Sequence, residues 1–281
     1  MKARRMASRI AKVLLTVLVL FQLAPAQTLS IAGALTDPSA HLSDFQVIEL
    51  RRYTVKNGAR TKFAQYFESF FPEAIEQTGA IVAGTFFERN HSNGFTWIRG
   101  FHNMEDRAID DAEFYYGPVW KEHRKTMNDL LMDSDNVLQL RPLSTERGVA
   151  IFPPVDPLAV TDGVRGIVVA LICPIKANDL DAFAQQAESS FANYRMTGAR
   201  EVGLLVTVDA ANNFPQLPVR TDGPYLVWLG LLKDNETLER ELTPAVENSI
   251  RTLTATGLLR SAPEFIILDP TPRSRLRWIA Q

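Results

Sequence analysis

The segment FAQYFESFF at residues 63–71 recurs as FAQQAESSF at residues 183–191, and Thr-Gly-Ala follows both copies, at 78–80 and at 197–199. An echo at nearly fixed spacing indicates two copies of one supersecondary unit in a single chain. The apolar residues of each segment recur at helical spacing, which predicts an amphipathic helix in each copy. Gly79 is suited to end the first of these helices.

Strand-like segments surround both predicted helices in the same order. In the first copy they lie at about 46–55, 80–89, 95–101 and 136–141, with further helical segments at about 103–115 and 118–132. In the second copy they lie at about 165–173, 202–208, 225–232 and 265–268, with a long helix between Leu238 and Leu253. Each copy therefore has the order β-α-β-β-α-β, which defines the ferredoxin-like unit.

Each of these units needs a cover for one face of its sheet, because its helices lie on the other face only. The sequence thus predicts an α+β fold in which two tandem ferredoxin-like units pack sheet to sheet as one intrachain α+β barrel. The expected boundaries are an extension at 27–44, a first unit at 45–145, a linker at 146–164 and a second unit with a C-terminal tail at 165–281. Since the usual dimerisation surface is then occupied, a monomer or weak homo-oligomer is expected.

The N-terminal stretch 1–26 has the order of a secretory signal peptide. Five basic residues precede the apolar run 13–23, and Ala24-Pro25-Ala26 follows as a cleavage site before Gln27. The run is shorter than the roughly 20 residues of a membrane span, so no stable span is expected after cleavage. The predicted location is the periplasm or the outside of the cell. A mitochondrial transit peptide is the alternative, although such peptides are amphipathic and this stretch separates its charged and apolar blocks.

The composition limits the classes of function. The chain has 281 residues, 46% of them hydrophobic, and a formal net charge of -2, so it is long enough for a sizeable core and is not basic like a nucleic-acid-binding protein. Cys173 is the single cysteine. It excludes an internal disulfide, and its apolar surroundings predict a small buried side chain.

Several short motifs resemble the NIPSNAP family. They are IELRRY at 48–53, Gly79 with Gly84, WIRGF at 97–101, YGPVW at 116–120, and DNVL at 135–138 followed by Arg141-Pro142. The resemblance covers about 45–143 and implies the dimeric α+β-barrel superfamily, in agreement with the repeat. Residues 165–275 match the family pattern poorly. The best-known members are mitochondrial and eukaryotic, unlike a chain with a secretory signal. Because biochemical function in the family is poorly defined, the resemblance implies a fold more than an activity.

Strand alternation predicts where a site would lie. Glu49, Arg51 and Tyr53 share one face of their strand, opposite Ile48 and Leu50. If helices cover Ile48 and Leu50, the polar set points into the barrel interior. The candidate cavity-lining residues are then Glu49, Arg51, Tyr53, Trp97, Arg99 and Arg141, with Trp120 and His123 added from the following helix. The corresponding strands of the second unit are nearly all apolar, so this unit is expected to act as a lid.

Two interpretations of the polar set remain open. Arginines and aromatic rings would suit a pocket for an anionic or aromatic small molecule. Alternatively, Glu49 forms a structural ion-pair network with Arg51 or Arg99. No catalytic motif, metal-ligand spacing or cofactor signature is recognisable. The expected function is therefore an exported binding or structural protein of undefined activity. The alternative is a monooxygenase-like or haem-binding protein, because some members of the superfamily use a histidine near a tryptophan, and His123 with Trp97 or Trp120 is the comparable arrangement in this sequence.

Overall fold

The computed structural model describes residues 44–155 and 165–279. The predicted signal peptide, most of the extension and residues 156–164 of the predicted linker lie outside this part of the chain. The first half contains β1 (Val47–Val55), α2 (Arg60–Phe70), α3 (Pro72–Glu76), β2 (Ile81–Glu88), β3 (Gly94–Phe101), α4 (Met104–Tyr115), α5 (Pro118–Leu130) and β4 (Leu131–Pro142). A short 3-10 turn, η2 (Thr145–Arg147), follows. The second half contains β5 (Ile167–Pro174), α6 (Leu180–Met196), β6 (Arg200–Thr207), β7 (Tyr225–Leu232), the π-helical segment η3 (Thr237–Leu242), α7 (Thr243–Ala255) and β8 (Glu264–Pro270).

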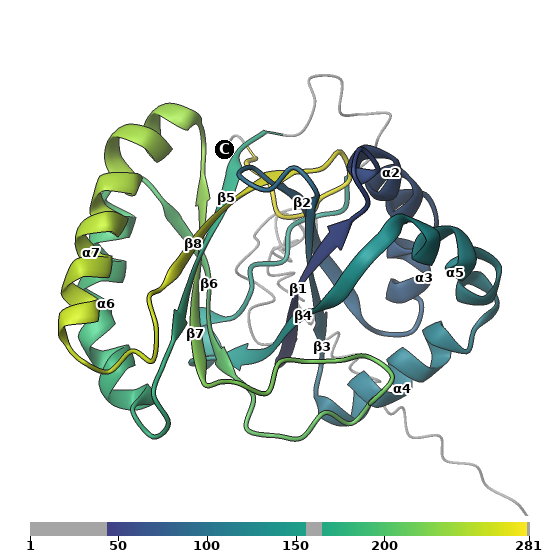
Figure 1. Cartoon of the computed structure of the whole chain (residues 1–281), viewed down its shortest axis with the longest axis horizontal. Coiled ribbons are helices and arrows are strands. Elements are labelled where there is room, and N and C mark those ends of the chain that lie inside the picture. The colour runs from purple at the N-terminus through teal and green to yellow at the C-terminus, as the bar shows by residue number, and fades with distance from the viewer. Residues whose placement is uncertain (1–43, 156–164, 280–281) are drawn as a thin grey trace, which may run out of the picture.

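The eight strands close into one antiparallel barrel in the order β1-β3-β2-β8-β5-β7-β6-β4. The two halves join at β2 with β8, where Phe86 lies opposite Pro270, and at β4 with β6, where Leu140 lies opposite Thr207. Helices α2 to α5 cover one side of the barrel, and α6 and α7 cover the other (Figure 1). The predicted α+β fold of two ferredoxin-like halves in one intrachain barrel is therefore confirmed.

The internal repeat extends to the backbone. Gly79 and Gly198 both have positive φ, +112° and +88°, at the turn before β2 and β6. Gly84 and Gly203 each follow a shift of register in these strands. Left-handed φ favours glycine because it has no Cβ. The two halves thus share the turn before β2 and β6 and the shift of register within these strands.

The barrel interior is filled by apolar side chains. One buried cluster takes residues from all eight strands, Ile48 and Leu50 of β1 and Val168 and Ala170 of β5 among them, and none from the long helices. Tyr53 belongs to a different cluster, together with the aromatic residues of α2. The expectation that the polar face of β1 points into the barrel is therefore wrong. Both faces of β1 are covered, and the interior takes the apolar one because the opposite sheet offers only apolar partners there.

Smaller details of the second half also follow the sequence. Cys173 is fully buried among apolar residues, and burial raises the pKa of its thiol to about 12. The long helix expected after Leu238 is a π-helical segment followed by α7, with Pro244 in the first turn of α7. Within 44–155 and 165–279, no helix is both long and apolar enough to cross a bilayer.

Candidate functional site

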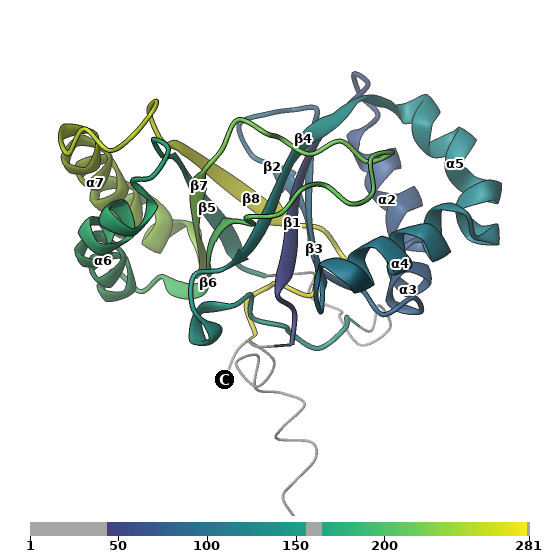
Figure 2. The same ribbon diagram turned by 90° about the horizontal axis from the view of Figure 1, so that it is seen from below.

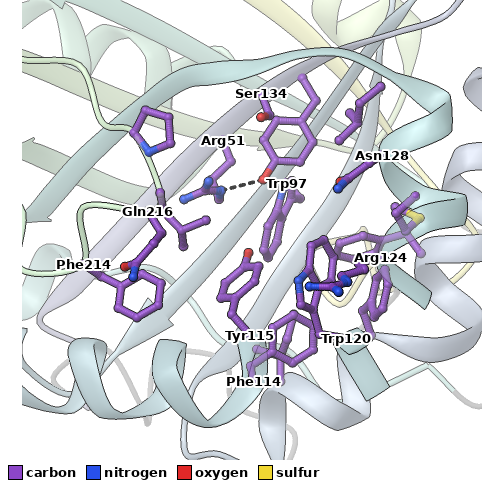
Figure 3. A pocket seen from close by; sticks show the side chains of 18 of the residues that line it. Arg51, Trp97, Phe114, Tyr115, Trp120, Arg124, Asn128, Ser134, Phe214 and Gln216 are labelled. Carbon is purple, nitrogen blue, oxygen red and sulfur yellow. Dashed lines mark hydrogen bonds between the residues drawn. The ribbon is translucent and has the colours of Figure 1, made fainter. Parts of the chain in front are cut away.

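A cavity of about 400 Å³ lies between the outer face of the first-half sheet and its helices. Arg51, Tyr53 and Trp97 of β1 and β3 contribute to its wall, and Figure 3 shows Arg51, Trp97 and Tyr115 around the same space. The helical side is built by side chains from α2 to α5 and the turns between them: Phe63, Phe67, Phe71, Ile75, Phe114, Tyr115, Tyr116, Trp120, Lys121, Arg124, Met127 and Asn128. Leu131 and Ser134 of β4 complete the first half's share.

The second half contributes the rest of the wall. Phe214, Gln216, Leu217 and Pro218 line the cavity from the connection between β6 and β7, residues 208–224. This connection runs from the second half across the sheet toward α4 (Figures 1 and 2). The second half therefore covers the site with a loop, whereas the sequence suggested that the whole unit would be the lid.

The loop is held to α4 and the turn after it by hydrogen bonds. Arg107 Nη1 donates to the side-chain oxygens of Asn212, at 3.1 Å, and Asn213, at 2.8 Å. The Asn213 amide donates to the carbonyl of Met104. Gln216 Nε2 donates to the Tyr116 hydroxyl at 2.6 Å. These contacts fix the position of the loop over the cavity.

The lining is aromatic and cationic. Among the described residues that line it, ten side chains are aromatic, and the charged members, Arg51, Lys121 and Arg124, are all cations. Arg51 is buried, whereas Lys121 and Arg124 are exposed at the rim on α5. Aromatic walls favour a planar apolar body, and the few polar groups orient it.

Arg51 is held in place from two sides. Its Nε donates to the Tyr53 hydroxyl at 2.8 Å, and its Nη1 donates to Glu49 at 2.6 Å. Its guanidinium carbon lies 5.6 Å from the ring centres of both Tyr53 and Trp97. Trp97 is itself buried, and its Nε1 has no hydrogen-bond partner among the described residues. A buried donor without a partner is rare.

A buried cluster of charges lies behind the cavity. Glu49 accepts from Arg51 and Arg99, both at 2.6 Å, and from Arg107 at 2.7 Å. Asp111 forms an ion pair with Arg99 at 2.7 Å. Burial alone would raise the pKa of Glu49, but the three arginines outweigh it and hold that pKa well below its usual range. For Asp111 burial prevails and raises the pKa despite Arg99.

The structure separates the residues that the sequence grouped. Arg51, Tyr53, Trp97 and Trp120 line the cavity, and Glu49 and Arg99 lie behind it in the charge cluster. Arg141 and His123 are absent from the lining. Arg141 is exposed and donates to the Pro142 carbonyl. His123 stacks on Phe70 with 3.9 Å between ring centres, and its Nδ1 is 2.8 Å from the Tyr66 hydroxyl. The predicted ion pairs of Glu49 with Arg51 and Arg99 are present, and four of the predicted residues line a cavity.

Sequence reasoning missed three contributions to the site. Arg107 and Asp111 lie one helical turn apart on α4, on the face that also buries Phe114. Their i,i+4 spacing beside an apolar residue was a usable signal for a buried pair. The 208–224 loop was the third, and its length between two strands was the available signal, because long connections are often functional.

Asp110 gives a pH-dependent prediction. Its side chain is buried on α4, and burial, followed by the charges of Asp106, Glu113 and Asp111, raises its pKa to about 6, although His102 opposes the shift. Between about pH 4 and pH 6 the folded state then binds more protons than the unfolded state, so this group lowers stability as pH rises. We expect Asp110→Asn to raise the urea midpoint at pH 7.5 and to leave it unchanged at pH 4. An equal gain at both values would contradict the assignment.

The fold and the cavity define a two-unit α+β-barrel protein. Comparison with known proteins assigns its first half to a family. The NIPSNAP family model matches residues 48–145, so this part of the chain is a NIPSNAP family domain. An uncharacterised NIPSNAP-like domain protein from Burkholderia xenovorans is 26% identical over 36% of this chain and 88% of its own, with a TM-score of 0.33.

Other solved structures extend over both halves. A putative monooxygenase from Lactobacillus acidophilus aligns with 84% of this chain and 100% of its own at 12% identity, with a TM-score of 0.51. A putative monooxygenase from Fusobacterium nucleatum aligns with 84% and 99% at 9% identity, with a TM-score of 0.50. At these identities the likeness concerns the fold alone. No curated protein matches the sequence.

Proposed function

We propose that the protein binds a small, planar and largely apolar molecule in the cavity between its first-half sheet and helices. The observation that carries the proposal is the cavity itself, about 400 Å³ in volume and lined by ten aromatic side chains. Pockets for small molecules have volumes of about 300 to 1,000 Å³, apolar walls and a few polar groups. A purely structural ion-pair network would account for Glu49 and Arg99 but not for the open space in front of Arg51.

A monooxygenase or haem-binding role has less support. Two structural neighbours are described as putative monooxygenases, but they share only the fold with this chain. His123, the expected haem or active-site histidine, packs on Phe70 and contacts Tyr66 instead of lining the cavity. The residues present therefore do not fit ligation by His123, and we favour binding over oxygenation.

Native mass spectrometry of protein purified from its own compartment tests the binding role. We expect an additional mass that is lost on denaturation. Ser134→Trp, which places an indole at the cavity wall, should remove this mass, and Asp133→Trp is the matched control because Asp133 is exposed beside it. Protein that carries no such mass, or a mass that Ser134→Trp leaves in place, would contradict the proposal.

Export and a monomeric state belong to the same proposal. The basic, apolar and small-residue order of residues 1–26 supports a secretory signal, and the barrel closes within one chain. The intact mass from the same experiment should correspond to a single chain that begins at Gln27. Exported material that still carries Met1, or a stable homodimer, would refute the respective part.

A further inference from the structure

The charge cluster behind the cavity contains more positive than negative charge. Three guanidinium groups contact two carboxylates: Arg51, Arg99 and Arg107 against Glu49 and Asp111. Each of the five side chains is at most 1% exposed. Within the part of the chain that the structure describes, no further carboxylate forms an ion pair with these arginines. Buried charges are costly unless they are paired, and this cluster has one more guanidinium than it has carboxylates.

Arg51 is the member of the cluster that can pair with a further negative charge. Arg99 is engaged by Glu49 and Asp111, and Arg107 by Glu49 and the asparagines of the 208–224 loop. Arg51 uses Nε and Nη1 for Tyr53 and Glu49, and its Nη2 has no hydrogen-bond partner among the described residues. Of the three, only Arg51 lines the cavity. The unbalanced positive charge therefore lies at the cavity wall.

We infer that the ligand of this cavity is an anion, a planar apolar body with one acid group, and that this group pairs with Arg51. The inference rests on the proposed binding function and specifies its ligand class. A guanidinium presents parallel donors that match a carboxylate or a similar acid. The aromatic side chains of the cavity surround the apolar body.

The rim supports the same ligand class. Lys121 and Arg124 are exposed on α5 at the edge of the cavity, and the lining contains no carboxylate among its described residues. A rim of one sign attracts ligands of the opposite sign and raises the rate of association more than the affinity. Arg51, which is shielded from water, is thus the residue that should decide affinity for the acid group.

Two fluorescent probes that differ by one charge test the inference. Anilinonaphthalene sulfonate is an anion, and phenylnaphthylamine is the same ring system without the sulfonate. We expect the wild-type protein to bind the anion more tightly. Arg51→Met should lower the affinity for the anionic probe by roughly tenfold or more, as expected for the loss of a charge-assisted hydrogen bond. The affinity for the neutral probe should change by less than about threefold, which is a small change in free energy. The affinity of Arg51→Lys for the anionic probe should lie between those of wild type and Arg51→Met, since lysine keeps the positive charge but lacks the paired donors of a guanidinium.

Arg141→Met is the matched control, because Arg141 is exposed and lies outside the cavity. It should change neither affinity. If wild type binds both probes equally, or if Arg51→Met weakens both to the same extent, the inference is wrong while binding of the neutral probe still supports the pocket. If neither probe binds folded protein, the proposed binding function itself fails. The neutral probe also shows whether Arg51→Met retains its fold.

Discussion

Glu49→Gln is expected to lower the free energy of unfolding by about 3–5 kcal/mol, the range for removing one partner of a buried ion pair. The Glu49 carboxylate is fully buried and accepts hydrogen bonds from three arginines. An amide cannot balance their charge, so the three guanidinium groups would share Asp111 alone. Urea denaturation at neutral pH, followed by circular dichroism, measures the change.

Two further variants give this experiment its controls. Glu122→Gln makes the same chemical change at an exposed position of α5 and should leave the urea midpoint unchanged. Arg51→Met should lower the free energy of unfolding much less than Glu49→Gln does, because it leaves two buried cations with two carboxylates. If Glu49→Gln unfolds at the same urea concentration as Glu122→Gln, the cluster does not stabilise the fold.

The effect of Glu49 should also depend on pH. Its folded-state pKa is depressed, so its stabilising contribution is fully present above its unfolded pKa and is lost as pH falls toward the folded value. The difference between wild type and Glu49→Gln should therefore be largest near neutrality and shrink in strong acid.

Trp228→Ala is the second substitution with a large expected effect, about 3–5 kcal/mol for a buried tryptophan. Trp228 of β7 is fully buried, its ring centre lies 4.9 Å from that of Tyr194, and its Nε1 donates to Glu201 at 3.0 Å. Truncation would leave a void in a filled core and remove one of the hydrogen bonds to Glu201, which keeps those from Arg147 and Arg195. Thermal or urea unfolding measures the loss.

Trp97 provides a matched comparison from the other half of the repeat. Trp97 lies opposite Arg51, whereas Trp228 lies opposite Leu171, at the equivalent register position. One side of Trp97 already borders the cavity, and its Nε1 has no partner to lose among the described residues. Trp97→Ala should therefore cost less stability than Trp228→Ala while abolishing ligand binding. An equal loss in both variants would mean that the space beside Trp97 is filled in solution.

The fold was predictable because its signals are local and occur twice. The helices at 63–71 and 183–191 carry apolar residues at helical spacing. In both copies a glycine with left-handed φ, Gly79 or Gly198, forms the turn between the helix and the next strand. Where the sequence of one copy does not distinguish helix from strand, the matching segment of the other copy does. The order β-α-β-β-α-β therefore follows from the residues alone. The strand expected at 136–141 begins earlier, at Leu131. Its first part was missed because residues 131–136 are mostly polar and show no alternation.

The face of the sheet that carries the site could not be predicted from the sequence. Alternation separates Glu49, Arg51 and Tyr53 from Ile48 and Leu50, but it does not say which set lies under helices. Both sets are buried in the structure, one under α2 to α5 and one in the barrel. A buried polar face is unusual, and here its charged side chains form ion pairs with Arg107 and Asp111 of α4, far along the chain. Phe214 and Gln216, which line the cavity from the other half, were not predicted either, because they too are far from β1 along the chain.

The connection between the two halves has a consequence for symmetry. A pair of identical chains would have to build two equal cavities and two equal covering loops. In a single chain the connections can differ: residues 89–93 between β2 and β3 form a short turn, whereas residues 208–224 between β6 and β7 form a long loop. One half is thus free to hold the cavity and the other to specialise as a solid support that also closes it. Because both halves belong to one chain, the barrel can hold one cavity in its first half and one covering loop from its second.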